Sequence, residues 1–349
     1  MRILYAIQGT GNGHASRARD LVPFLKSKAQ CDVLISGTQC DVKAFDFQVD
    51  YHLKGLSFVF GKNGGIDLVK TLFAINLFRF RHEIVTLPVE QYDLIINDFE
   101  PVSAWAARLR KVPCVSVSHQ SAVLSPKAPR PTFNDWKGEF ILRNYAPVEK
   151  AYGFHFRQYD KNISTPVIRQ QIRQMVPTNK GHFTVYLPAY SDKTIIDTLS
   201  KVEGTHWQVF SKHAQKQHNH GNIEIHPIDN LKFLKSLETC RGILCGAGFE
   251  TPAEALFLGK RLMVIPMKGQ YEQHLNAAAL KELGVPVINQ LHSKVKEIQR
   301  WVERGKAIKV NYPDNAESII VQVLNNFIGK KQSRSYVPET ITDLSQTVL

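Results

Sequence analysis

The sequence predicts an α/β protein with two Rossmann-like domains, each built on a parallel sheet, that face each other across a cleft. The chain has 349 residues, more than one ordinary core holds. Short apolar runs alternate with helix-like runs, a pattern typical of parallel sheets covered by helices on both faces. The alternation occurs in two sets, separated by a polar stretch near residues 152–169. These observations predict domains over 1–160 and 161–328, followed by a tail over 329–349.

The first set opens with RILYAI, an uninterrupted apolar run that ends at a glycine turn, as expected of a buried strand. CDVLIS, YDLIIN and PCVSVS have the same character, and helix-like stretches separate them. Strands are expected at 2–7, 31–36, 92–97 and 113–118, and helices at 15–28, 66–88 and 101–111.

The second set repeats the pattern, beginning with HFTVYLP and ending with RLMVIP and the helices that follow it. Strands are expected at 182–188, 206–211, 223–227, 242–247 and 261–266. Helices are expected at 191–201, 230–239, 250–258, 271–283, 293–304 and 314–328.

The charge and cysteine content narrow the class of protein. A net charge of +13 favours an anionic partner, whether a nucleotide, a nucleic acid or an anionic membrane surface. The absence of zinc-finger spacing and of an RNA-recognition motif argues against nucleic acid. Five cysteines without CxxC spacing indicate reduced thiols, and no apolar run is long enough to span a bilayer. We therefore expect a cytoplasmic protein, without excluding peripheral contact with a membrane.

The first glycine turn, QGTGNGH, follows the first strand, where ligands bind in an open parallel sheet. Gly11, Asn12 and Gly13 would let the backbone approach a ligand, and the next helix N-terminus would face an anion. A dinucleotide fingerprint reads GxGxxG with an acidic residue after the second strand. Here the spacing is GxGxGH and the second strand ends in ISGTQ, which argues against a nicotinamide oxidoreductase.

His14 ends this turn, and Asp98 follows a central strand at the same predicted edge of the sheet. An isolated histidine at a helix start is more often a capping or packing residue. A carboxylate beside it would hold the imidazole in one tautomer and leave its other nitrogen free as a base. Asp98 could instead cap the helix that begins at Pro101, a role that Glu100 could also fill.

The second glycine turn follows the strand GILC and contains Gly246 and Gly248. A helix then begins, and a hydroxyl in its first turn, that of Thr251, could hold a phosphate together with free N–H groups. Glu254 lies three residues further, on the same helix face, where its carboxylate could accept both hydroxyls of a ribose. A surface glutamate is the plainer alternative.

A third cluster opens the next helix, in KGQYEQHLNAA. Glu272 and Gln273 lie at the edge where the preceding strand ends. Carboxylate and amide groups together suit a polyhydroxylated ligand, because each hydroxyl both donates and accepts a hydrogen bond.

With these motifs, the chain resembles the GT-B glycosyltransferases, especially the group of MurG-type and UDP-glucuronosyl/UDP-glucosyltransferases. GTGNGHASR is similar to their GGTGGH-type loop, and VSHQSAV to a His/Gln segment of MurG-like proteins. GAGFETPAEAL with QYEQHLNA is similar to their donor signature, and HPIDNLKFLKSLETCRGILCGAG to the approach to it. The resemblance covers most of the chain.

The resemblance implies roles for the residues singled out above. His14 would be the catalytic base and Asp98 its partner, while the GGS-type phosphate loop of the family is replaced here by PAY before Ser191. The implied donor contacts are the glycine turn at Gly11, Asn12 and Gly13, Ser191 for a phosphate, Ile228 for uracil, Gly246, Gly248 and Thr251 for the diphosphate, Glu254 for ribose, and Glu272 and Gln273 for the sugar.

The reaction so implied is an inverting transfer from a UDP-sugar to an acceptor hydroxyl, with no cofactor and, since no DxD motif is present, no metal. The acceptor is open; a lipid-linked glycan is one candidate, because the segment 65–85 combines aromatic and basic residues that could dock on an anionic membrane. A core helix with basic residues reaching solvent is the favoured alternative for that segment. Alternatives for the whole chain are a UDP-sugar hydrolase, a 2-epimerase and a non-catalytic binding protein.

Overall fold

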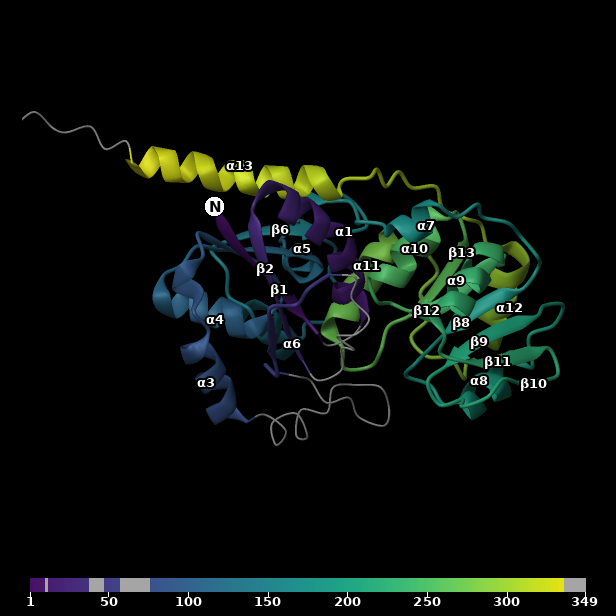
Figure 1. Ribbon diagram of the computed structural model, residues 1–349. Helices are drawn as coiled ribbons and strands as arrows, with labels where there is room; N and C mark the ends of the chain where they lie inside the picture. The colour runs from purple at the N-terminus through teal and green to yellow at the C-terminus, as the bar shows by residue number, and fades with distance from the viewer. Residues whose placement is uncertain (10–11, 38–46, 57–75, 336–349) are drawn as a thin grey trace, which may run out of the picture.

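The protein folds into two lobes that lie side by side, as a computed structural model shows (Figure 1). The structure describes residues 1–9, 12–37, 47–56 and 76–335. Each lobe contains one mostly parallel sheet flanked by helices, so the predicted α/β fold with two sheets is confirmed.

The sheet of the first lobe has seven strands in the order β3-β2-β1-β4-β5-β6-β7, and all neighbouring pairs are parallel. The strands are β1 (Arg2–Gln8), β2 (Gln30–Ser36), β3 (Tyr51–Leu53), β4 (Leu94–Asp98), β5 (Cys114–Ser118), β6 (Lys150–Phe154) and β7 (Ile163–Ser164). The strand order reverses between β1 and β4, and at such a switch point two neighbouring loops diverge and open a crevice.

The apolar residues of β1 explain why this strand is central. Ile3, Tyr5 and Ile7 join one apolar cluster, whereas Leu4 and Ala6 join another on the opposite face. A strand buried on both faces needs the continuous apolar run that the sequence shows. The register pairs Ile7 with Asp98 and so brings the ends of β1 and β4 together.

The helices of the first lobe are α1 (Asn12–Lys28), α3 (Leu77–Thr86), η2 (Val89–Gln91), α4 (Pro101–Arg110), α5 (His119–Val123) and α6 (Trp136–Asn144). The helix expected over 66–88 is described only from Leu77, because residues 57–75 lie outside the described part. Sequence analysis did not identify β3, β6, β7, α5 or α6. The segment 152–169, predicted as a polar break, contains the end of β6 and all of β7.

The sheet of the second lobe has six strands in the order β10-β11-β9-β8-β12-β13, in which only the pair β10–β11 is antiparallel. The strands are β8 (Phe183–Tyr186), β9 (Trp207–Ser211), β10 (His218–His220), β11 (Ile223–Pro227), β12 (Gly242–Gly246) and β13 (Arg261–Ile265). Here the order reverses between β8 and β12, which places a second switch point directly before the second glycine turn.

The remaining helices are α7 (Gln170–Arg173), α8 (Asp192–Leu199), α9 (Asn230–Thr239), α10 (Glu250–Phe257), α11 (Tyr271–Glu282), α12 (Val295–Arg304) and α13 (Ala316–Ser335). The last of these crosses back from the second lobe and lies along α1 of the first (Figure 1). The structure therefore groups α13 with the first sheet, although its sequence was assigned to the second domain, and extends it into the segment predicted as a tail.

Candidate active site

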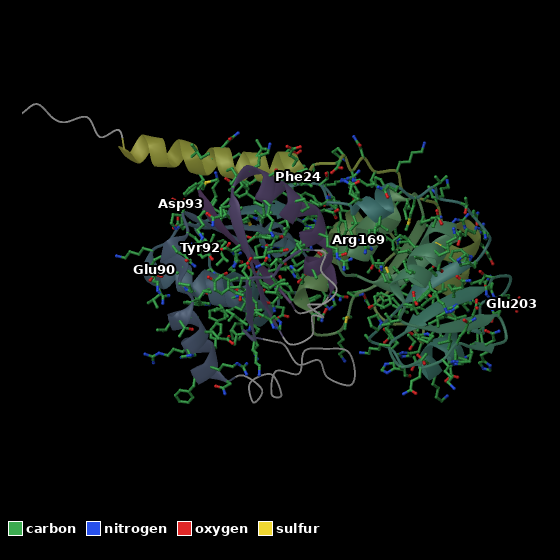
Figure 2. The ribbon with its side chains drawn as sticks, viewed as in Figure 1. Phe24, Glu90, Tyr92, Asp93, Arg169 and Glu203 are labelled. Atoms are coloured by element: carbon green, nitrogen blue, oxygen red, sulfur yellow. The ribbon has the colours of Figure 1, made fainter. Side chains whose placement is uncertain are left out.

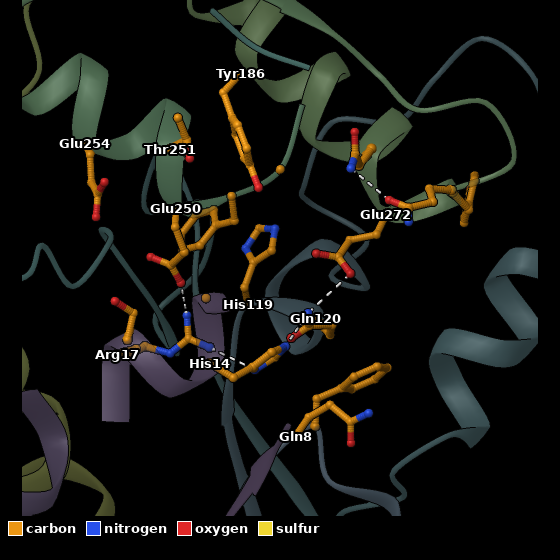
Figure 3. Close-up of a pocket in the computed structure, with 18 of the residues that line it drawn as sticks. Gln8, His14, Arg17, His119, Gln120, Tyr186, Glu250, Thr251, Glu254 and Glu272 are labelled. Atoms are coloured by element: carbon orange, nitrogen blue, oxygen red, sulfur yellow. Dashed lines mark hydrogen bonds and ion pairs between the residues drawn. The ribbon is translucent and has the colours of Figure 1, made fainter. Parts of the chain in front are cut away.

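The two glycine turns meet at one cavity of about 860 Å³, lined by residues of both lobes. Figure 3 shows the side chains around it, with α1 and α5 on one side and α10 and α11 on the other. Eight of the residues predicted from the sequence line this cavity, namely Gly13, His14, Ile228, Gly248, Thr251, Glu254, Glu272 and Gln273.

His14 and Asp98 form a hydrogen-bonded pair at the switch point of the first sheet. Nδ1 of His14 lies 2.9 Å from Oδ1 of Asp98, whose side chain is fully buried. The alternative role of Asp98, capping α4, is filled by Glu100, which accepts hydrogen bonds from the backbone N–H groups of Val102 and Ser103. Asp98 is thus free to orient the imidazole.

Two contacts of His14 agree on its tautomer. The carboxylate of Asp98 can only accept, so Nδ1 donates to it. Nε2 lies 3.4 Å from the side-chain nitrogen of Gln120, an amide group that donates. Nε2 therefore carries the lone pair, and this is the nitrogen that could take a proton from a ligand in the cavity.

Arg17, which sequence analysis did not identify, holds the other side of Asp98. Its Nη2 lies 2.9 and 2.8 Å from the two carboxylate oxygens, and its Nη1 donates to Glu250 of α10 at 2.5 Å. Its position three residues after His14, on the same face of α1, was the available signal. Glu250 was recognised in the sequence only as a helix start.

Burial and ion pairing compete over the two carboxyl groups that Arg17 holds. Burial alone would raise the pKa of Asp98, but Arg17 and His14 beside it bring the pKa below its ordinary value. Burial raises the pKa of Glu250 to about 7 despite the opposing effect of Arg17. Asp98 therefore stays ionised at neutral pH, whereas Glu250 titrates there.

The second glycine turn leaves room at the N-terminus of α10. A Cβ added at Gly248 would meet no atom within 4 Å. The N-cap residue Phe249 makes no side-chain capping hydrogen bond, so no side chain covers the N-terminal amides through the N-cap. Thr251, in the first turn, lines the same cavity. An anion placed here would meet free amides and the positive end of the helix dipole.

Glu254, one turn further along α10, is held by Arg169, which also was not identified in the sequence. The guanidinium binds both carboxylate oxygens, with distances of 2.5 and 2.8 Å. Arg169 lies where the two lobes meet (Figure 2), in the segment between β7 and α7. Each carboxylate oxygen retains a further lone pair, so the pair can still accept hydroxyl groups.

The start of α11 supplies the third predicted cluster. Glu272 accepts a hydrogen bond from Gln120 at 3.2 Å, and Gln273 accepts one from the backbone N–H of Met267 at 3.0 Å. His119, next to Gln120, bonds Asn276 of α11 at 2.6 Å and stacks on Phe249 with ring centroids 3.7 Å apart. These contacts tie the end of β5 to the second lobe.

Some predicted residues are placed elsewhere. Ser191 caps α8, accepting from the N–H of Thr194, and is not among the residues that line the cavity. Gly246 lies behind it, where an added Cβ would be 3.5 Å from Gln273. Gly11 and the side chain of Asn12 lie outside the described residues.

Two searches over the described residues concern metals and membranes. No group of three or more His, Cys, Asp or Glu that could hold a metal ion is found among them. Within the same part of the chain, every helix is too short or too polar to cross a bilayer.

Comparisons with known proteins agree with this geometry. The sequence model of the family described as "Glycosyl transferase family 1" matches residues 1–304. A search of curated proteins finds no match. Among solved structures, the chain resembles the spinosyn forosaminyltransferase SpnP, with 14% identity, a TM-score of 0.56, and 94% of this chain and 99% of that one covered.

Two further solved structures are similar. MurG of Acinetobacter baumannii has 15% identity and a TM-score of 0.55, with 93% and 99% coverage. UGT2 of Phytolacca americana, in complex with UDP-2-fluoro-glucose and pterostilbene, has 11% identity and a TM-score of 0.57, with 95% and 98% coverage. These likenesses show a shared fold.

Proposed function

The chain belongs to glycosyl transferase family 1 and is a glycosyltransferase with the GT-B fold, and we propose that it transfers a sugar from a UDP-sugar to an acceptor hydroxyl with inversion at the anomeric carbon. The single observation that carries the proposal is that the His14–Asp98 pair and the open turn at Gly248 line or adjoin one cavity. A base and an anion site then face the same space from opposite lobes.

In the proposed reaction, the acceptor oxygen attacks the anomeric carbon from the face opposite the diphosphate. The hydroxyl proton passes to Nε2 of His14, the nitrogen that bears the lone pair, while the C–O bond to the diphosphate breaks and UDP leaves with the electron pair. Asp98 stabilises the imidazolium through Nδ1–H, at 2.9 Å.

The leaving diphosphate gains negative charge, which α10 is arranged to offset. The amides after Gly248, the hydroxyl of Thr251 and the helix dipole all lie at the site where that charge develops. Glu254 would accept the ribose hydroxyls, and Glu272 and Gln273 those of the sugar. The UDP-2-fluoro-glucose bound to Phytolacca UGT2 supports UDP as the nucleotide.

The test is to measure transfer and nucleotide affinity in His14→Ala. General-base catalysis is worth roughly 10²–10⁴ in rate, so turnover should fall by about that factor. UDP affinity should be retained, because the proposed nucleotide contacts are on the second lobe. His218→Ala, which removes an exposed histidine of β10, is the matched control and should keep full activity. Ordinary turnover in His14→Ala would refute the base assignment.

Incubation with UDP-sugars and no acceptor distinguishes the alternatives. Free sugar would indicate a hydrolase, and an epimerised sugar would indicate a 2-epimerase. Protection of the fold by nucleotide sugars without turnover for any acceptor would indicate a binding protein.

For the acceptor, we propose a molecule presented at an anionic membrane surface. Helix α3 exposes 68% of Leu77 and 90% of Phe78, beside the basic side chains of Arg79 and Arg81. Exposed aromatic and basic residues on one helix suit the interface of an anionic bilayer. The rest of the segment to which the sequence assigned this contact, residues 57–75, lies outside the described part.

Sedimentation with vesicles containing phosphatidylglycerol tests this contact. The protein should sediment at low salt and less at high salt, and Phe78→Ser should weaken the effect. Val176→Ser, which removes another exposed apolar side chain, serves as the control and should leave it unchanged. No sedimentation at low salt would contradict the proposal.

A further inference from the structure

Four charged or titratable side chains form a continuous line from the first lobe to the second. His14 bonds Asp98, Asp98 bonds Arg17, and Arg17 bonds Glu250 on the first turn of α10. Nη2 of Arg17 also lies 3.2 Å from Nδ1 of His14, so its positive charge is next to the imidazole. Figure 3 shows Arg17 between His14 and Glu250.

The surroundings of this line leave little freedom to its members. Asp98 is fully buried and the side chain of Arg17 is 2% exposed. A Cβ added at Gly13 would lie 3.0 Å from Cγ of Glu250, so a side chain there would press on the glutamate. Buried ion pairs contribute little net stability, because desolvation offsets their attraction. Stability alone therefore does not account for a buried pair that joins the lobes beside the candidate base.

We propose that Arg17 and Glu250 are positioning residues of the transfer reaction, which set the proton affinity of His14 and link it to the donor-binding helix α10. This inference rests on the proposed function, because only a base needs its proton affinity set. Neither residue is assigned contact with the reacting atoms.

The direction of each effect follows from the charges. Asp98 favours the imidazolium form of His14, and Arg17 opposes it, both by its own charge and by sharing the carboxylate. Glu250 offsets Arg17 and so restores part of the proton affinity. The other charged group facing His14 is Glu272 of α11, which is linked to it through Gln120.

The link to α10 has a consequence for the order of events. Glu250 occupies the first turn of the helix against which the diphosphate is proposed to lie. A bound donor would bring further negative charge near Arg17 and so strengthen His14 as a base. The base would then be strongest when a donor is in place.

NMR titration of the histidine ring resonances, without any substrate, tests the inference. The His14 signal is assigned by its loss in His14→Asn. Arg17→Met should move the His14 midpoint to higher pH by about one unit or more, as expected for removing a charge within 4–6 Å. Glu250→Gln should move it to lower pH by less. An unchanged midpoint in both variants overturns the inference.

Two variants guard against trivial results. Arg17→Met leaves a buried carboxylate without its cation and could unfold, whereas Glu250→Gln is nearly isosteric and keeps a partner for Arg17. Glu282→Gln is the matched control, because it also removes an ion pair between the lobes, that with Arg157 at 3.3 Å, but at an exposed position. The control should not move the His14 midpoint, and a shift equal to that of Glu250→Gln would count against the inference.

Activity provides an independent measurement. The acid limb of the kcat/KM profile should shift in the same opposite directions, whereas a merely structural defect would lower the rate at every pH. Arg17→Lys should keep the limb near its wild-type position while lowering kcat, because one ammonium group cannot reproduce the fork that binds both carboxylates. Absence of transfer by the wild type would overturn the proposed function and leave the titration result intact.

Discussion

Gly248 stands where the proposed diphosphate would lie, and replacing it with alanine separates binding from folding. An added Cβ would meet no protein atom within 4 Å, and the backbone of Gly248 is not in the left-handed region that favours glycine. The folded protein therefore has no reason of its own for glycine here. If the space is kept for a ligand, only ligand binding should suffer.

The two effects of Gly248→Ala have opposite signs. The free energy of unfolding should rise by about 0.4–1 kcal/mol, because alanine restricts the unfolded chain. Donor binding should weaken, since a methyl group at the turn displaces the diphosphate from at least one backbone N–H. A hydrogen bond to a charged group is worth about 1.5–3 kcal/mol, which corresponds to a loss of roughly tenfold to hundredfold in affinity.

Isothermal calorimetry with UDP and urea denaturation measure the two quantities. Gly181→Ala is the matched control, because its added Cβ also meets nothing, but its φ of +92° is strained for alanine. That variant should lose stability and keep its UDP affinity. If Gly248→Ala binds UDP as tightly as the wild type, the diphosphate does not lie at this turn and the donor assignment is refuted.

Three further outcomes are expected. Glu254→Gln should weaken UDP binding by about tenfold or more but leave the affinity for 2′,3′-dideoxy-UDP unchanged, because only ribose hydroxyls would use the lost carboxylate oxygen; equal losses for both ligands in calorimetry would argue against the ribose contact. Burial raises the pKa of Glu250 from 4.5 to about 7, so the folded protein binds this proton more tightly than the unfolded chain. Its contribution to the free energy of unfolding should be complete below about pH 4 and lost as the pH rises through 7, and urea denaturation of Glu250→Gln should lack this component. Lys260 donates to three backbone carbonyl oxygens at 2.7–2.9 Å, so Lys260→Met should cost at least about 1–3 kcal/mol in the same assay; an unchanged free energy of unfolding would show that water replaces the ammonium group.

The central strands were predictable because burial on both faces leaves a plain signal. The expected ranges for β1, β4, β5 and β12 agree with the observed strands to within two residues at each end. The edge strand β6 was missed for a physical reason. Its Gly153 is required because a Cβ would lie 2.7 Å from that of Ala122 in α5, and glycine removes the side-chain pattern by which a strand is recognised.

The candidate site was predictable where a residue stands in a turn whose location the topology fixes. His14, Gly248 and Thr251 follow strands at the two switch points, and all three line the cavity. Arg17 and Arg169 were not predictable in this way. Each lies within or beside a helix, where an arginine is ordinarily a surface residue, and its partners are distant in sequence.

The separation of these partners is also why the site joins the lobes. Asp98 is 84 residues from His14, and Glu250 is 233 residues from Arg17, yet the four side chains are in direct contact. The parallel register of β1 and β4 brings the first pair together, and the packing of α1 against α10 brings the second. A change in the angle between the lobes would leave His14 bonded to Asp98 but separate Arg17 from Glu250. The catalytic pair therefore belongs to one rigid sheet, whereas the charge that adjusts it depends on how the two lobes meet.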